Sequence, residues 1–214
     1  MSGATAVVTV KRFDAAKQRL AGEMEPPRRQ ALAAAMAADV LEAIGAARSV
    51  ERTLVVSGEP GAAEIAAEFG AEIVADPDDA GHVAAALMGI ARAEETGADT
   101  VILLPGDCPL LDPRELDRLL TGIPDPYVAI VPDRHGEGTN SLVLRPPRAI
   151  VPSYGEGSRA RHVAAARETG VPFAVERIAS LELDLDTPAD VIALTRELER
   201  RRGRAKRTAK VLGI

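Results

Sequence analysis

Aromatic residues, cysteines and long apolar runs are all scarce in this chain of 214 residues. It has no tryptophan, two tyrosines and three phenylalanines, so Ala, Val, Leu and Ile must form the core. We therefore expect no nucleic-acid partner that stacks its bases on aromatic rings. A single cysteine, Cys108, excludes an internal disulfide and a cysteine zinc cluster. No apolar run approaches the roughly 20 residues of a membrane span, and the N-terminus lacks a signal-peptide pattern, which together predict a cytoplasmic protein.

Negatively charged residues are absent from one stretch near the C-terminus. The chain has a net charge of −6, but "RRRGRAKRTAK" (200–210) contains no acidic residue. We expect a domain over residues 1–199 and a basic tail over 200–214 that extends the last helix into solvent. The body of the protein is then strongly acidic, and it would need local basic residues or a metal cation to handle phosphates.

Strand-like and helical segments alternate through the first 122 residues. The expected strands are 5–10, 52–58, 71–76 and 100–107, and the expected helices are 28–47, 62–70, 82–97 and 112–122. This order predicts a mostly parallel sheet with helices on both faces. Further strands are expected at 127–133, 139–147, 171–178 and 180–186, with helices near 158–170 and 187–203. We therefore predict one α/β domain whose sheet has a mixed C-terminal edge.

Asp107 stands where a buried strand ends. In "LLPGDCPLLDP" (103–113) the apolar run stops at Pro105-Gly106 and the carboxylate follows at once. Ligands of open parallel sheets bind at the carboxyl ends of strands, which gives Asp107 a functional interpretation, with an Asx turn as the alternative. Asp112 is explained as a helix cap, and the acids of the loop 76–79 as solvated side chains.

A second pair of carboxylates lies in "LELDLDTP" (181–188). In a strand, alternate residues share a face, so Asp184 and Asp186 would point the same way. Asp107 and Asp184 could together hold Mg²⁺, which binds through one or two carboxylates and the phosphates of a substrate. The alternatives are a surface role for Asp184 and a helix-starting role for Asp186.

Two further segments could bind anions. Lys11, Lys17 and Arg19 follow the first strand, either as a solvated basic loop or as a cradle for a triphosphate. In "GEGSRA" (155–160) the glycines would let backbone amides approach an anion, and Ser158 would add a hydroxyl at the start of a helix. A plain turn fits that spacing equally well. No phosphate-binding P-loop motif is present, and the histidines lack the spacing of a metal site.

Taken together, five segments resemble a known enzyme family. They are "VTVKRFDAAKQRLA", "LLPGDCPLLDP", "DRHGEGTNSLVL", "YGEGSRARH" and "LDLDTPAD". The chain is similar to the 2-phospho-L-lactate / phosphoenolpyruvate guanylyltransferases of coenzyme F-420 biosynthesis, from about residue 5 to residue 195. The resemblance implies a single-domain GT-A-like, MobA-like nucleotidyltransferase fold. It also implies Mg²⁺-dependent transfer of GMP from GTP to a small phospho-acid, with release of pyrophosphate.

The resemblance also implies roles for particular residues. Asp107, Asp184 and Lys17 would be catalytic, and Asp107 and Asp184, with Asp186 as a substitute, would bind the metal. The phospho-acid would be bound by Thr139, Gly155 and Ser158, and the GTP phosphates by Lys11, Lys17 and Arg19. The expected partners are GTP and the phospho-acid. A homodimer and a hand-off of an unstable product to the next enzyme of the pathway are compatible with the resemblance.

The chain departs from the family pattern at two positions. Gln18 stands where a serine is frequent, and Ala84 stands where we would align an asparagine, which puts the preference for guanine in question. Two alternatives therefore stay open. One is a nucleotidyltransferase of the same fold with another acceptor, such as a sugar phosphate. The other is a non-catalytic nucleotide-binding protein whose tail docks onto RNA or an acidic partner.

Overall fold

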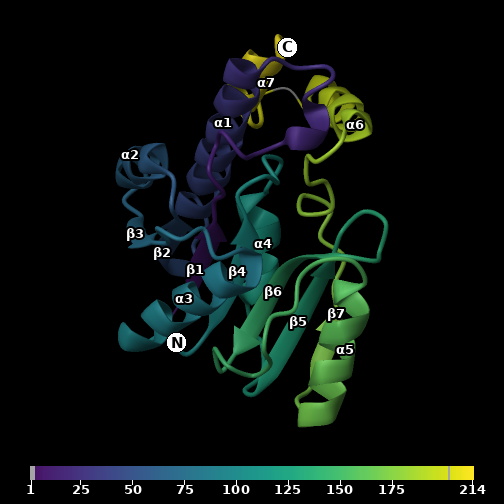
Figure 1. The fold of residues 1–214 in the computed structure, drawn as a ribbon. Coiled ribbons are helices and arrows are strands. Elements are labelled where there is room, and N and C mark those ends of the chain that lie inside the picture. The colour runs from purple at the N-terminus through teal and green to yellow at the C-terminus, as the bar shows by residue number, and fades with distance from the viewer. Residues whose placement is uncertain (1–2, 202) are drawn as a thin grey trace.

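The apolar runs of the sequence form a single sheet. A computed structural model of the chain describes residues 3–201 and 203–214. The strands are β1 (Ala4–Thr9), β2 (Val50–Ser57), β3 (Glu72–Ala75), β4 (Val101–Pro105), β5 (Tyr127–Pro132), β6 (Thr139–Arg145) and β7 (Phe173–Val175). They are arranged in the order β3-β2-β1-β4-β6-β5-β7 (Figure 1).

Strand direction changes only in the C-terminal half of the sheet. β3, β2, β1 and β4 run parallel to one another, and β6 lies antiparallel between β4 and β5. β7 then pairs parallel with β5. The α/β fold therefore has the expected mostly parallel sheet with a mixed C-terminal edge.

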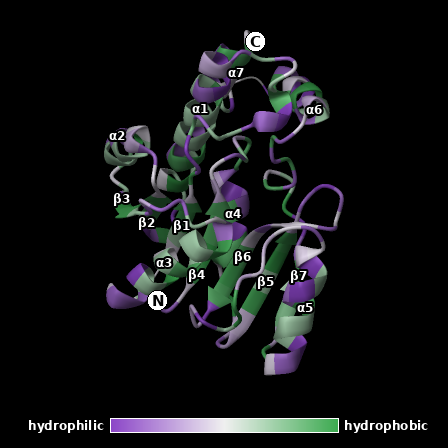
Figure 2. Cartoon of the chain, in the orientation of Figure 1, coloured by the Kyte–Doolittle hydropathy of each residue, from purple (hydrophilic) through white to green (hydrophobic). Residues whose placement is uncertain are grey.

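Helices cover both faces because successive strand residues point to opposite sides. Helices α1 (Pro26–Gly45), α2 (Pro60–Glu68) and α4 (Pro113–Leu120) pack on the face that contains Val8, and α3 (His82–Glu95) and α5 (Ser158–Thr169) pack on the face that contains Val7. Figure 2 shows the strands as the most hydrophobic part of the chain. α3 lies so close to β1 that a Cβ at Gly89 would overlap Val7, and this explains the glycine inside a helix.

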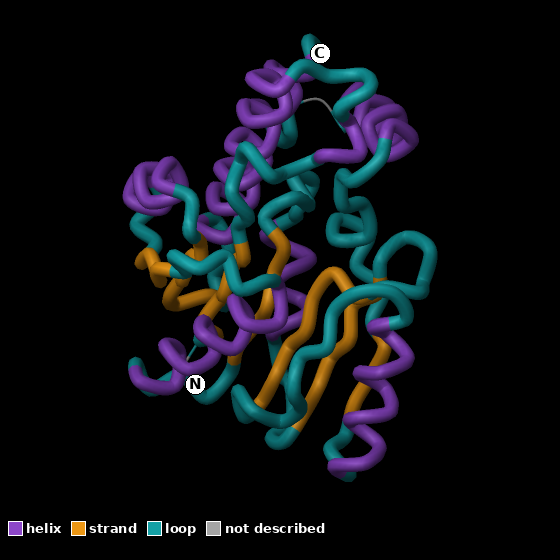
Figure 3. Tube along the Cα trace, viewed as in Figure 1, coloured by secondary structure: helices purple, strands orange, loops and turns teal. Residues whose placement is uncertain are grey.

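One predicted strand is wrong. Residues 180–186 form an irregular segment between β7 and helix α6 (Pro188–Arg200) (Figure 3). Its leucines at 181, 183 and 185 are nevertheless buried, whereas Asp184 is half-buried and Asp186 is exposed. The alternation of leucine and acidic residues therefore does not reflect the pleat of a strand. It arises because the leucines pack into two core clusters.

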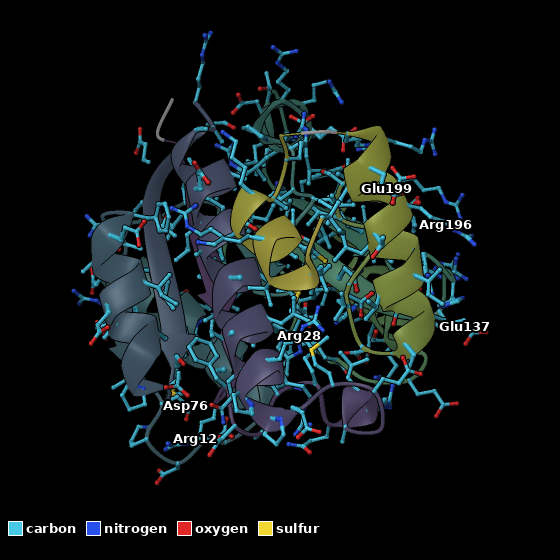
Figure 4. The ribbon with its side chains drawn as sticks, turned by 90° about the horizontal axis from the view of Figure 1, so that it is seen from above. Arg12, Arg28, Asp76, Glu137, Arg196 and Glu199 are labelled. Carbon is cyan, nitrogen blue, oxygen red and sulfur yellow. The ribbon has the colours of Figure 1, made fainter. Side chains whose placement is uncertain are left out.

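The C-terminal tail was expected to extend α6 into solvent. It instead folds back onto the body of the protein. Helix α7 (Lys206–Leu212) packs on α1, where Asp39 accepts hydrogen bonds from the N–H groups of Arg207 and Thr208. At its other end Arg28 donates to the carbonyl groups of the last residues of α7 (Figure 4). Arg202 of the basic segment lies outside the described residues, and the division at residue 199 stays a prediction. None of the helices within the described ranges is long and apolar enough to cross a membrane.

Candidate active site

A cavity of about 810 Å³ opens at the carboxyl ends of β1 and β4. Its walls come from the loops after these strands, the start of β6, the start of α5 and the segment before α6. All the residues predicted for catalysis or binding line it: Lys11, Lys17, Arg19, Asp107, Thr139, Gly155, Ser158, Asp184 and Asp186. The structure therefore brings the predicted residues to one place, while their individual roles stay predictions.

An ammonium group joins two of the carboxylates. Lys17 Nζ lies 2.5 Å from Asp107 Oδ2 and 3.2 Å from Asp186 Oδ1. Lys17 has left-handed backbone angles (φ 55°, ψ 37°) just before the short 3₁₀ helix η1 (Gln18–Leu20), and its side chain is 7% exposed. Burial opposes both charges, but the ion pairs outweigh it. They hold the pKa of Lys17 above and the pKa of Asp107 below the ordinary values.

Asp184 is held differently. Asn140 Nδ2 donates to Leu181 O at 2.7 Å and to Asp184 Oδ1 at 3.3 Å, so β6 fixes the irregular segment that carries this carboxylate. Burial, together with the negative charge of Asp107, raises the pKa of Asp184 to about 6. Asp107 and Asp184 both line the cavity, as a cation shared between them would require.

A capping box supports Asp186. Thr187 caps α6 and exchanges hydrogen bonds with Asp190. Asp190 also accepts from the N–H of Asp186 and forms a 2.5 Å ion pair with Arg134. The β5–β6 turn is thereby tied to the segment that carries the carboxylates. At α4, Asp112 caps the helix as predicted, and Glu115 accepts from the N–H of Ser180.

These carboxylates fit a hard divalent cation. The donors are oxygen atoms, and Asp107 and Asp186 already contact one positive group between them. Within residues 3–201 and 203–214 no group of three or more His, Cys, Asp or Glu side chains is assembled as a metal cage. A cation at this cavity would therefore rely on one or two carboxylates, with water and substrate phosphates completing its shell.

The starts of β6 and α5 offer hydrogen-bond donors to the cavity. Ser158 is the first residue of α5, after Gly155 (φ 101°) and Gly157 (φ 68°), whose positive φ angles suit glycine. Thr139 is the first residue of β6, and both hydroxyl-bearing residues are buried. Thr139 Oγ1 lies 3.0 Å from Nδ1 of His162, which is fully buried. A helix N-terminus with adjacent hydroxyl groups is suited to bind an anion.

Two features of the cavity were not predicted. The rings of His82 and Tyr154 stack at 4.0 Å with an interplanar angle of 3° and form part of the wall. Asp76 was expected to be solvated but is 4% exposed and accepts from the N–H of Ala80. Figure 4 shows Asp76 next to Arg12 at one side of the molecule, and Arg12 donates to the carbonyl of Pro77. The loop after β3 is therefore an ordered part of the site.

Comparison with known proteins decides the family. A family described as "Guanylyl transferase CofC like" matches residues 4–204. The chain belongs to this family. A phosphoenolpyruvate guanylyltransferase of Conexibacter woesei is 48% identical over 97% of this chain and 94% of its own length. One of Sphaerobacter thermophilus is 41% identical over 87% of this chain and 89% of its own length. A 3-phospho-D-glycerate guanylyltransferase of Phenylobacterium zucineum is 34% identical over 90% of this chain and 90% of its own length.

Solved structures show how far the fold of this CofC-like guanylyltransferase is shared. A nucleotide-diphospho-sugar transferase from Desulfovibrio desulfuricans matches with a TM-score of 0.74 and 18% identity, over 99% of this chain and 97% of that one. A Mycobacterium tuberculosis protein in complex with manganese matches with a TM-score of 0.56 and 20% identity, over 90% and 97%. At these identities the likeness concerns the fold.

Membership in the family and the fold were both predicted from the sequence. The supporting residues Asn140 and His162 were not assigned roles, although both fall inside quoted motifs. Ala84, the residue that put the preference for guanine in question, belongs to the first turn of α3. Its neighbours His82 and Ala85 line the cavity. The supporting roles of Asn140 and His162 depend on contacts between different helices, strands and loops. The spacing of residues along the sequence does not predict such contacts.

Proposed function

We propose that the protein transfers GMP from GTP to the phosphate of phosphoenolpyruvate, releases pyrophosphate, and thereby serves coenzyme F-420 biosynthesis. The observation that carries the proposal is the shared cavity. It combines the pair Asp107 and Lys17 with Thr139 and Ser158 in one cavity. The names of the relatives from Conexibacter and Sphaerobacter support phosphoenolpyruvate as the acceptor.

The reaction needs positioning more than proton transfer. An oxygen of the acceptor phosphate, already an anion, forms a new bond to the α-phosphorus of GTP, and the bond from that phosphorus to the β-phosphate breaks. The electron pair leaves with pyrophosphate, so no general base is required. The main obstacle is the approach of two polyanions, which cationic and hydrogen-bonding groups overcome by neutralising and aligning them.

The residues of this chain divide the work. Asp107 and Asp184 would hold Mg²⁺, which neutralises phosphate charge and aligns the reacting groups when it is bound. Lys11, Lys17 and Arg19 would contact the GTP phosphates, and Thr139, Gly155 and Ser158 would bind the phospho-acid. Lys17 would exchange its carboxylate partners for phosphate oxygens, because a divalent cation takes over the neutralisation of Asp107.

The test is an assay of pyrophosphate release by the purified protein with GTP and Mg²⁺. Phosphoenolpyruvate, 2-phospho-L-lactate and 3-phosphoglycerate are supplied separately, and we expect the highest kcat/KM with phosphoenolpyruvate. D107N should lose at least about a hundredfold in kcat, because the charge that holds the cation is removed while the shape is kept.

Asp78 offers a matched control, since it is an exposed aspartate of the loop 76–79, and D78N should keep full activity. Turnover without a divalent cation, or normal turnover by D107N, would refute the proposed site. A cytoplasmic location, a homodimer and a direct hand-off of the product stay predictions.

A further inference from the structure

We propose that His162 is a positioning residue that turns the Thr139 hydroxyl into a hydrogen-bond donor directed at the phospho-acid. The inference rests on the proposed function, since it assigns the acceptor to the wall that carries Thr139 and Ser158. It concerns a residue that would not touch substrate itself and would act through its neighbour. Thr139 would then recognise an anionic oxygen and not a hydroxyl or ammonium group.

The protonation of the ring follows from one hydrogen bond. His162 Nε2 lies 2.8 Å from the backbone nitrogen of Ser153, and a backbone N–H can only donate. Nε2 must therefore accept, and it carries no proton. In a neutral imidazole the proton is then on Nδ1, which is the tautomer that the partner of the other nitrogen dictates.

The second hydrogen bond fixes Thr139. Nδ1–H of His162 donates to Thr139 Oγ1 at 3.0 Å, so the hydroxyl oxygen acts as an acceptor on that side. Its own proton must point elsewhere. Thr139 lines the cavity, and within the described part of the chain its hydroxyl has no other hydrogen-bond partner. The free O–H direction is thus available to an anion in the cavity.

The charge state of His162 agrees with this arrangement. A protonated ring would place Nε2–H against the N–H of Ser153, so that two donors would face each other. Burial, followed by the positive charge of Arg161, lowers the pKa of His162 to about 4. Tyr154 packs edge-on against the ring at 5.7 Å. The ring is therefore neutral near pH 7 and cannot itself serve as a cation for the substrate.

The same ring links two parts of the acceptor wall. Ser153 begins the segment that leads through Gly155 to Ser158, and Thr139 belongs to β6. Arg161 reinforces this segment by donating to Ser153 Oγ at 2.8 Å and to the carbonyl of Tyr154 at 2.8 Å. His162 thus sets the distance between the hydroxyl on the strand and the amides at the helix start.

The tautomer can be tested on the unaltered protein. Nitrogen-15 NMR of the full chain labelled at histidine distinguishes Nδ1–H from Nε2–H rings, and H162Q assigns the signal among the three histidines. We expect a neutral ring with the proton on Nδ1 at pH 7. A proton on Nε2 would overturn the proposal, whatever the enzyme does with phosphoenolpyruvate. An inactive parent protein with the Nδ1–H ring would instead refute the proposed function.

Kinetics test the action through Thr139. H162N keeps an amide N–H near the position of Nδ1, whereas H162Q places its amide near Nε2 and loses the donor to Thr139. We expect H162Q and T139V to raise KM for phosphoenolpyruvate at least about tenfold, because a hydrogen bond to a charged group is lost or misdirected. H162N should stay within about threefold of the parent, and KM for GTP should change less than about twofold.

A double variant separates positioning from a structural role. If His162 acts through Thr139, H162Q should add less than about twofold to the KM effect of T139V. H135Q, which changes an exposed histidine of the β5–β6 turn, is the matched control. Full additivity of H162Q and T139V, or equal losses in H162N and H162Q with KM for GTP rising in parallel, would overturn the proposal.

Discussion

At the scale of single residues, Lys17 occupies the position that matters most electrostatically. Its ammonium group contacts Asp107 and Asp186, and the side chain is nearly withdrawn from solvent. Two carboxylates and a cation so close form a strongly coupled group, because low exposure reduces screening by water. A divalent cation that binds the same carboxylates must therefore compete with this ammonium group.

This competition predicts the behaviour of K17M, which keeps the apolar stem and removes the charge. We expect K17M to bind Mn²⁺ about tenfold more tightly than the parent in the absence of nucleotide, and to lose at least about a hundredfold in kcat/KM for GTP. Electron paramagnetic resonance of free Mn²⁺ measures the affinity, and K206M, on an exposed lysine of α7, is the control. Unchanged affinity for Mn²⁺ would show that the two cations use different oxygens.

His162 predicts a pH dependence of stability. Its pKa is about 4 in the folded protein and 6.5 ordinarily, so between these values the unfolded chain binds the extra proton. Stability from this group is thus full above pH 6.5 and falls as the pH decreases toward 4. We expect the parent to lose about 2 kcal/mol more than H162Q between pH 7 and pH 4.5, measured by urea unfolding. Parallel losses in both proteins would contradict a buried neutral histidine.

At the scale of elements, α7 shows how a basic segment can be structural. Arg207 reaches Glu42 at 2.7 Å and Glu68 at 2.8 Å, and it lies over the ring of Phe69. The N–H groups at the start of α7 bond to Asp39, which is 4% exposed. The positive charges that suggested a solvated tail thus include groups that attach the helix to the acidic face of α1 and α2.

The buried cap should matter more than the exposed ion pairs. D39A removes the acceptor for two backbone N–H groups at the start of α7, and we expect it to destabilise the protein by about 2 kcal/mol. E68A removes an exposed partner of Arg207 and should cost less than about 1 kcal/mol. Thermal unfolding followed by circular dichroism measures both. A larger loss in E68A than in D39A would contradict the assigned contacts.

The periodicity of the sequence was sufficient for most elements but not for all. Helices and strands in the N-terminal half have long periodic patterns and follow the predicted order. The segment 180–186 has the same alternation of leucine and acid, but its leucines reach two different apolar clusters, so no strand forms. Likewise, charge alone could not predict that α7 folds back, because its partners are on helices more than a hundred residues earlier.

At the scale of the whole molecule, residues far apart in the sequence meet because the carboxyl ends of parallel strands share one edge of the sheet. That rule was sufficient to predict that Lys17 and Asp107 converge, whereas Asp184 reaches the cavity on an irregular segment and not at the end of a strand. It does not specify side-chain hydrogen bonds between elements. The pair Thr139 and His162 depends on how α5 lies against β6, and the support of Asp184 by Asn140 depends on an irregular segment.

Because one cavity joins these distant parts, its ligands should stabilise the entire fold. Mg²⁺ and GTP at about a hundred times their dissociation constant should raise the free energy of unfolding by about 2.7 kcal/mol, since they bind only the folded state. Thermal shift in the presence and absence of the ligands measures this, and D107N should show a smaller shift at the same concentrations. An equal shift in D107N would place the nucleotide away from this carboxylate.

The residues proposed to bind the two substrates come from different parts of the chain, and the antiparallel strand β6 marks the division between them. Groups assigned to the triphosphate precede β6 or follow β7, whereas those assigned to the phospho-acid fall within residues 139–158. With these proposed assignments, one continuous stretch would control the choice of acceptor, and within it Asn140 also supports Asp184 and would have to be kept. A chimera that exchanges only this stretch between relatives would inherit the donor from one parent and the acceptor from the other.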